Sequence, residues 1–351
     1  MLTFVALAVL HLSASSAQAP LREPQMASSS RTVALAYGAG NAIYVQTSTD
    51  RGQSFAAPVK VAEVGVLPLS RHRGPRVVFS GTTLVVTAVT GEMVAEGPHG
   101  HGLATDGNLY AWRSTDGGQT WSKAARVNDA LAAAREGLHT LAADQHGHVF
   151  AAWLDLRTGT TQLYGAFSKD AGVTWSRNVL LYHSPDGHIC ECCHPSAAYA
   201  ENGSLDVMWR NCMDGSRDFF TIHSRDGKKF GPAQKVGMGT WKINACPMDG
   251  GGIAHAGGKT ITAWRREEDV FLSQPGKEEK QIGAGHDVTL AANADHVYVA
   301  WIEDQALKLW RDGEITTVDG KAAFPSLVSL PDGTALLAWE DGGGISVEEV
   351  R

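Results

Sequence analysis

The densest group of chemically reactive side chains in this sequence is a short run of cysteines and histidines. Thiolate, thioether and imidazole groups together suit Cu(I), Zn(II) or an iron centre. The run reads His188-Ile189-Cys190-Glu191-Cys192-Cys193-His194-Pro195, and Cys212-Met213 and Cys246-Pro247-Met248 follow it. The sequence predicts a soft-metal or redox site, with copper favoured, zinc as the alternative and no cofactor as the third hypothesis. Its candidate ligands are Cys190, Cys192, Cys193, Cys212, Cys246, His188, His194 and Met248.

The five cysteines also admit a purely structural interpretation. In an exported chain they could form two disulfides, with one thiol left over. Two features favour chemistry: an odd count leaves an unpaired thiol, and the adjacent Cys192 and Cys193 cannot both reach ordinary partners without local strain. No spacing matches a standard zinc finger, so the disulfide and metal hypotheses both stay open.

The elements that must position these side chains are repeated β-strands. Seven apolar phrases, most of them ending in Ala-Trp, recur along the chain. Each has a short strand before it and two strands after it, as residues 140–182 illustrate, which is the meander of a propeller blade. The sequence therefore predicts an all-β propeller of four-stranded blades, with seven blades favoured and six as the alternative. The segment from Arg22 to Met26 is expected to close the last blade. The seven phrases are residues 33–37, 84–88, 149–153, 205–209, 260–264, 297–301 and 335–339.

A second repeat is a turn that begins with Ser-x-Asp and ends in an aromatic residue. Its aspartate accepts hydrogen bonds from the turn's own amides, glycine supplies a positive φ, and the aromatic ring packs under the hairpin. The four aspartates, Asp50, Asp116, Asp170 and Asp226, are therefore interpreted as structural. The copies are residues 48–55, 114–121, 168–175 and the shorter 224–230.

This turn resembles the Asp-box, or bacterial neuraminidase repeat, of sialidases and other β-propellers. The resemblance implies membership of the sialidase-like superfamily and covers nearly the whole mature chain. In an up-and-down blade, the Asp-box turns lie on one face and the loops before the inner strands lie on the other. All five cysteines are therefore expected on the face opposite the Asp-boxes, at blades four and five. The same face is expected to carry His72, His139, Asp249 and His286, with His99 and His101 nearby.

A sialidase would hold a sialic acid carboxylate with three arginines and use a Tyr nucleophile, a Glu and an Asp. Arg210, Arg265 and Arg157 are the candidate catalytic residues that the resemblance implies. The family's early Arg-Ile-Pro signature is missing, however, and no Tyr is placed in a suitable loop. The alternatives are an exo-sialidase-like hydrolase or glycan-binding propeller, and a disulfide-stapled protein-interaction propeller. Whether the protein is an enzyme stays open.

Composition bounds the class of protein. The chain has 351 residues, 43% of them hydrophobic, and a net charge of −7, which makes nucleic acid an unfavourable partner. Leu2 to Leu12 is apolar and small residues follow it, which predicts a signal peptide over residues 1–19 and a single propeller domain over residues 20–351. The expected location is secreted or periplasmic, with no transmembrane segment in the mature chain. Fitting partners are a small molecule, a glycan or a metal-delivery protein.

Overall fold

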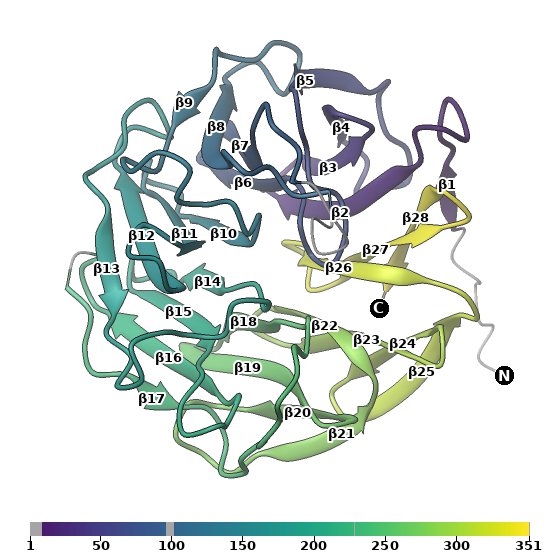
Figure 1. Ribbon diagram of the computed structural model, residues 1–351. Coiled ribbons are helices and arrows are strands. Elements are labelled where there is room, and N and C mark those ends of the chain that lie inside the picture. The colour runs from purple at the N-terminus through teal and green to yellow at the C-terminus, as the bar shows by residue number, and fades with distance from the viewer. Residues whose placement is uncertain (1–8, 96–101, 228, 351) are drawn as a thin grey trace, which may run out of the picture.

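The protein is a ring of seven antiparallel sheets around a central axis (Figure 1). The computed structural model describes residues 9–95, 102–227 and 229–350, and every regular element in these ranges is a β-strand. No helix in the described ranges is long and apolar enough to cross a membrane. The predicted fold class is confirmed, with seven blades rather than six. Three parts of the sequence predictions lie outside the described ranges: residues 1–8 of the predicted leader, His99 and His101.

Each blade has four strands that follow one another in the sequence, from the axis outwards, except in the last blade. The blades are, in order, β2 (Leu21–Ser28), β3 (Val33–Ala39), β4 (Ala42–Ser48) and β5 (Val59–Glu63); β6 (Arg76–Ser80), β7 (Thr83–Thr90), β8 (Asn108–Ser114) and β9 (Ala125–Arg126); β10 (His139–Ala143), β11 (Val149–Asp155), β12 (Gln162–Ser168) and β13 (Val179–Tyr182); β14 (Ser196–Tyr199), β15 (Leu205–Arg210), β16 (Phe219–Ser224) and β17 (Gln234–Lys235); β18 (Gly251–Ala256), β19 (Lys259–Arg266), β20 (Asp269–Ser273) and β21 (Lys280–Ala284); β22 (His286–Ala292), β23 (Val297–Glu303), β24 (Ala306–Arg311) and β25 (Glu314–Asp319); and β26 (Ala323–Ser329), β27 (Ala335–Asp341) and β28 (Gly344–Val350) with β1 (Leu10–Leu12).

The ring is closed by β1, which pairs with β28 as the outermost strand of blade seven. The expected closing segment, Arg22 to Met26, is instead part of β2, the innermost strand of blade one. That expectation was wrong because β3 needs an inner partner, and β2 supplies it through a short local hairpin. Local pairing of this kind loses less chain entropy than a closure across the whole ring. Leu10 to Leu12 also lie within the segment predicted to be a leader.

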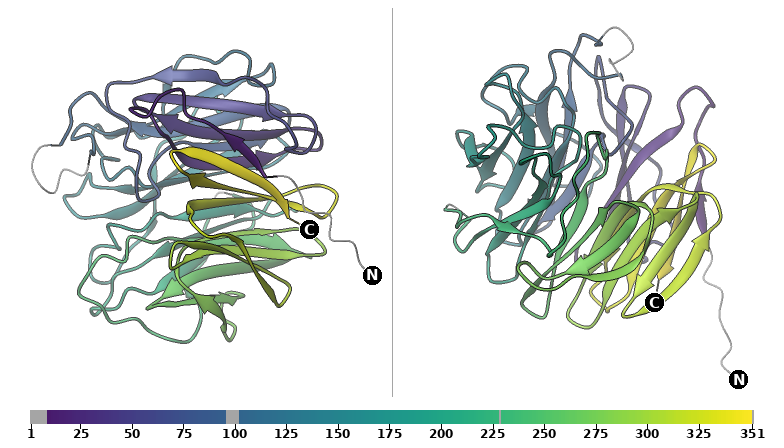
Figure 2. Two further views of the ribbon diagram at one scale, coloured as in Figure 1. Left: turned by 90° about the vertical axis from the view of Figure 1, so that its right-hand side faces the viewer. Right: turned by 60° about the horizontal axis from the view of Figure 1, so that its bottom comes forward.

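The repeated apolar phrases form the second strand of each blade and carry the core. In β11, all seven residues are buried, because neighbouring blades cover both faces of the sheet. The tryptophans that end four of these phrases are at most 1% exposed: Trp153, Trp209, Trp301 and Trp339. Seen from the side, the blades follow one another around the ring (Figure 2), and the strands nearest the axis are β2, β6, β10, β14, β18, β22 and β26. This packing fixes the strand ends, and therefore the loops between them, in space.

The Asp-box turns show the predicted local bonding. Asp116 Oδ1 accepts hydrogen bonds from the amides of Gln119 and Thr120, at 3.1 and 2.9 Å, and from Ser114 Oγ at 2.7 Å. Its Oδ2 accepts from Thr120 Oγ1 at 2.5 Å, and these bonds lower the pKa of Asp116. Asp50 and Asp170 repeat the pattern. The Asp170 turn also meets the first hairpin of its blade, since Ala171 N donates to Gly147 O, so these two turns share a face.

We expect Asp116→Ala to lower the melting temperature by roughly 2–6 °C, because two turn amides and two hydroxyls lose their acceptor. Any activity per folded molecule should not change, because the turn is expected on the face opposite the cysteines. Thermal unfolding followed by circular dichroism measures the first quantity. Glu314→Ala, at an exposed strand end, is the control. A variant with the wild-type melting temperature but no activity would show that the aspartate is not structural.

We expect His139, the first residue of β10, to make the folded state less stable in acid. It is fully buried, and its Nε2 lies 3.0 Å from Thr87 Oγ1 in blade two. Burial, with a smaller contribution from the charge of Arg76, lowers the pKa of His139 to about 3. The folded state therefore keeps this imidazole neutral, whereas the unfolded chain binds a proton below about pH 6.5.

The free energy of unfolding therefore decreases as the pH falls from about 6.5 toward 3. By pH 4, protonation of this residue in the unfolded chain lowers that free energy by about 3 kcal/mol. We expect His139→Gln, which can still bond to Thr87, to lose less unfolding free energy than the wild type between pH 7 and pH 4. Urea unfolding at the two pH values measures this difference. Equal losses in the two proteins would contradict the assignment.

Candidate metal centre

The cysteine loop, residues 188–195, is held by backbone hydrogen bonds to the segments around it. It precedes β14, and Ile189 N donates to Thr161 O at 3.0 Å while Cys190 N donates to Arg210 O at 3.1 Å. Ile189 is fully buried and forms a β-bridge with Asn211 at the end of β15. The apolar side chain between two polar residues thus anchors the loop, and this places the next residues at the mouth of the ring.

Three thiols meet directly behind this anchor. Cys190 Sγ lies 3.6 Å from Cys192 Sγ and 3.5 Å from Cys193 Sγ, and the latter two sulfurs are 3.9 Å apart. The three residues are 0%, 5% and 1% exposed, and Met248 packs against them. A disulfide bond is about 2.05 Å long, so none of these pairs is bonded. All five cysteines of the chain are free thiols in the structure.

The thiols are electrostatically unequal. Hydrogen bonds with Cys192 and Cys193 lower the pKa of Cys190 well below its ordinary value, and the nearby Arg210 acts in the same direction. Bonding to the other two sulfurs raises the pKa of Cys192, and burial raises that of Cys193. Within the cluster, these shifts favour the thiolate form at Cys190 and the thiol form at Cys192 and Cys193. A thiolate is the form of cysteine that binds metal.

The other two cysteines lie beside the cluster. Cys246 is exposed, and its Sγ donates to Glu191 Oε1 at 3.7 Å. Glu191 also accepts a bond from Arg217 at 3.1 Å. Cys212 is 9% exposed, and burial raises its pKa while the charge of Arg217 opposes the rise. The charge of Cys190 acts on the pKa of both Cys212 and Cys246, so both thiols lie close to the cluster.

The two histidines named from the sequence point elsewhere. His188 Nδ1 lies 3.1 Å from the carbonyl oxygen of Asp186 in its own loop. The His194 ring faces His72 across a centroid distance of 4.6 Å. The structure thus brings together Cys190, Cys192, Cys193 and Met248. His194 instead faces the central channel of the ring.

The three arginines named as catalytic candidates are engaged by the protein itself. Arg210 is 1% exposed, and its terminal nitrogens donate to the carbonyls of Arg217, Asp249 and Arg265 at 2.8, 3.2 and 3.0 Å. Arg265 donates to Glu267 O at 2.5 Å. Arg157 binds Asp155 and Asp129, each at 2.8 Å. This arrangement does not favour the carboxylate clamp of a sialidase.

The central channel of the ring, beside the cysteine loop, brings together His72 and His194, which the sequence pattern named, and Asp287, which it did not. A cavity of about 440 Å³ follows the inner strands, and His72, Arg76, His194 and Asp287 are among its lining. Asp287 has φ 57° at a register shift of β22, and Glu23 has φ 54° at the matching shift of β2. Irregularities of this kind turn side chains toward the axis. A proline after Glu23 is the one visible signal of them in the sequence.

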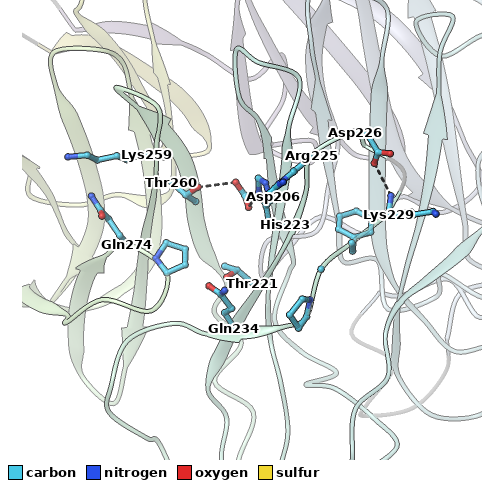
Figure 3. Close-up of a pocket in the computed structure, with 14 residues that line it drawn as sticks. Asp206, Thr221, His223, Arg225, Asp226, Lys229, Gln234, Lys259, Thr260 and Gln274 are labelled. Atoms are coloured by element: carbon cyan, nitrogen blue, oxygen red, sulfur yellow. Dashed lines mark hydrogen bonds and ion pairs between the residues drawn. The ribbon is translucent and has the colours of Figure 1, made fainter.

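A larger hollow lies away from the cysteines, between the outer strands of blades four and five on the Asp-box side. It measures about 680 Å³, and Figure 3 shows its lining. Its buried acid, Asp206, lies 2.9 Å from His223 Nδ1 and accepts a bond from Thr260 Oγ1 at 2.9 Å. None of its lining residues is a cysteine. Neither this hollow nor the channel cavity is lined by the three clustered thiols.

Comparison with known proteins agrees with the repeat and the fold. A family described as BNR repeat-like domain matches residues 79–249, which contain three of the four Asp-boxes. The matched repeat and the seven-bladed ring together support the sialidase-like Asp-box superfamily that the turn resembles. A sequence search of curated proteins found no match.

Solved structures with similar folds include enzymes that act on sugars. A leech intramolecular trans-sialidase, complexed with 2,7-anhydro-Neu5Ac, has a TM-score of 0.57 at 11% identity over 99% of this chain and 70% of that one. An α-L-arabinanase from Penicillium chrysogenum has a TM-score of 0.58 at 13% identity over 99% and 98%. A protein of unknown function from Dyadobacter fermentans has a TM-score of 0.57 at 13% identity over 98% and 99%. At such identities the likeness extends to the fold alone.

Proposed function

We propose that this propeller binds a soft metal ion, copper in the first place, through the thiols of Cys190, Cys192 and Cys193. The observation that carries the proposal is the sulfur spacing of 3.5 to 3.9 Å in a buried cluster. Two thiolates on one ion with bonds of about 2.3 Å stand about 3.8 Å apart in tetrahedral geometry. The thiols therefore need little movement to bind one ion.

The ligand set favours Cu(I) over zinc. Thiolates and a thioether are soft ligands that select Cu(I), and Met248 is the thioether packed against the three sulfurs. Structural zinc sites usually have four nitrogen or sulfur ligands from cysteine and histidine. His188 and His194 face other groups, so the fourth ligand of such a set would have to come from Cys246 or Cys212. Arg210 and Arg217 lie near enough to favour the thiolate form of Cys190.

Metal analysis combined with a thiol count tests the proposal. Protein purified under reducing conditions and reconstituted with Cu(I) is expected to hold copper in a fixed ratio to chain. Its thiols should react with Ellman's reagent when the metal is absent and resist it when copper is bound. Two clean disulfides, one inert thiol and no metal after reconstitution would overturn the proposal and support the disulfide-stapled alternative.

Export is part of the proposal, and it rests on the apolar run before the first blade. Cleavage after Ala19 would remove Leu10 to Leu12 and leave β28 as the outer strand of blade seven. The N-terminal sequence of the protein recovered from the producing cells decides this point. An intact N-terminus in the cytoplasm would contradict export.

A further inference from the structure

A second cluster of metal-binding side chains lies on the channel side of the thiols. His72 Nε2 is 2.7 Å from Asp287 Oδ1, and the Asp287 amide donates to Asp249 Oδ2 at 3.2 Å. One ligand atom from each of these three residues lies within 4.8 Å of the others. The His194 ring stands 4.6 Å from that of His72. The four residues come from blades two, four, five and six, so the ring itself brings them together.

Two polar atoms in this cluster have no hydrogen-bond partner. Asp249 is 1% exposed, and its Oδ1 is unpartnered. The buried Nδ1 of His194 is unpartnered as well. A buried polar atom without a partner destabilises the fold, so such atoms in a native structure call for an explanation. A bound cation would supply the missing partner for both a carboxylate oxygen and an imidazole nitrogen.

The positions of these groups are tightly constrained. His72 and Asp287 both have positive φ, 65° and 57°, a conformation that only surrounding structure can enforce. A Cβ at Gly250 would lie 2.2 Å from the nearest His194 ring atom, so glycine is needed to seat that ring. Strained backbone and close packing that converge on one point are typical of a functional site.

Carboxylates lie on two sides of His72. Its Nε2 is 2.7 Å from Asp287 Oδ1, and its amide donates to Glu23 Oε1 at 3.0 Å. The guanidinium of Arg76 donates to the carbonyls of Pro75 and His72 and not to these acids. The cluster therefore combines imidazole with carboxylate oxygens that Arg76 does not occupy.

From this geometry we infer that His72, His194, Asp249 and Asp287 form a second metal site, which binds a divalent transition-metal ion such as Zn(II) or Co(II). Imidazole and carboxylate ligands suit these ions rather than Cu(I), so the site does not depend on the thiol cluster. His72, His194 and Asp287 line the channel cavity, and any open coordination position would therefore face it. A small ligand in the channel could then reach the metal.

Cobalt titration separates the two sites, because Co(II) bound to thiolates gives an intense near-ultraviolet charge-transfer band and Co(II) bound to nitrogen and oxygen gives only weak visible bands. The protein used is the triple variant C190S/C192S/C193S, checked for folding by near-ultraviolet circular dichroism. It is expected to bind one Co(II) per chain without the thiolate band. Wild-type protein that already carries one equivalent of colourless Cu(I) should bind Co(II) in the same way, and this covers the case in which the triple variant does not fold.

Asp249→Asn and His72→Gln, each made in the same background, should weaken Co(II) binding by about 10–100-fold. Asp144→Asn is the matched control, because it alters an Asp–His pair on the Asp-box face and should leave affinity unchanged. If neither background binds Co(II), or if Asp249→Asn and His72→Gln bind as well as their parent, the second site does not exist. Failure of the thiol site would give a different result. Wild-type protein would then bind Co(II) at the channel without showing the thiolate band.

Discussion

Cys190→Ser is expected to lower the affinity for Cu(I) by at least about 100-fold while the propeller stays folded. Cys190 is the thiol nearest to both other sulfurs, and it is the one whose pKa is lowered. Serine keeps the size of the side chain but offers no soft ligand. Competition with a chromogenic Cu(I) chelator measures the affinity, and the melting temperature reports the fold.

The Cu(I) affinity of Cys246→Ser is the comparison, because Cys246 lies beside the three clustered thiols. Its sulfur is exposed and bonded to Glu191, so its replacement should cost much less affinity than that of Cys190. Cys212→Ser is expected to lie between the two. Equal loss in all three variants would indicate a different ligand set, and no loss in any of them would remove the thiols from the site.

The fold could be predicted because its signals are local. The Asp-box acts through bonds within four residues of Asp116, and the Ala-Trp phrases form strands that are buried on both faces. The sequence of each blade therefore contains the interactions that build it. Closure of the ring by Leu10 to Leu12 could not be predicted in this way, because three residues pair with a strand more than 300 positions away.

The candidate site could be predicted only in part. Cysteine spacing pointed to Cys190, Cys192 and Cys193 as candidate ligands, since residues so close in sequence cannot lie far apart. The direction of His194 depends on blades two and five, where His72 and Gly250 contact its ring. Asp287 turns toward the axis through a register shift that leaves no mark in the residue types around it. The partners of Arg210 are likewise backbone carbonyls, which no side-chain pattern indicates.

Arg210→Met is expected to lower the free energy of unfolding by about 3–5 kcal/mol. The guanidinium bonds to the carbonyl oxygens of Arg217, Asp249 and Arg265, and its carbon lies 4.1 Å from the centre of the Phe219 ring. Methionine fills part of the volume but leaves three carbonyls of blades four and five without a donor. Urea unfolding followed by tryptophan fluorescence measures the change. The control is Arg126→Met on an exposed outer strand, where a change within about 0.5 kcal/mol is expected.

The same variant distinguishes a structural arginine from a catalytic one. If Arg210 held a sialic acid carboxylate, wild-type protein would release sialic acid from sialosides, and Arg210→Met would abolish this activity with little loss of stability. We expect the opposite pair of results: no release above background by the wild type, and a large loss of stability in the variant. The reason is that three N–H groups of the guanidinium already donate to carbonyls within the protein, and the side chain is only 1% exposed, which leaves a ligand carboxylate little access to it.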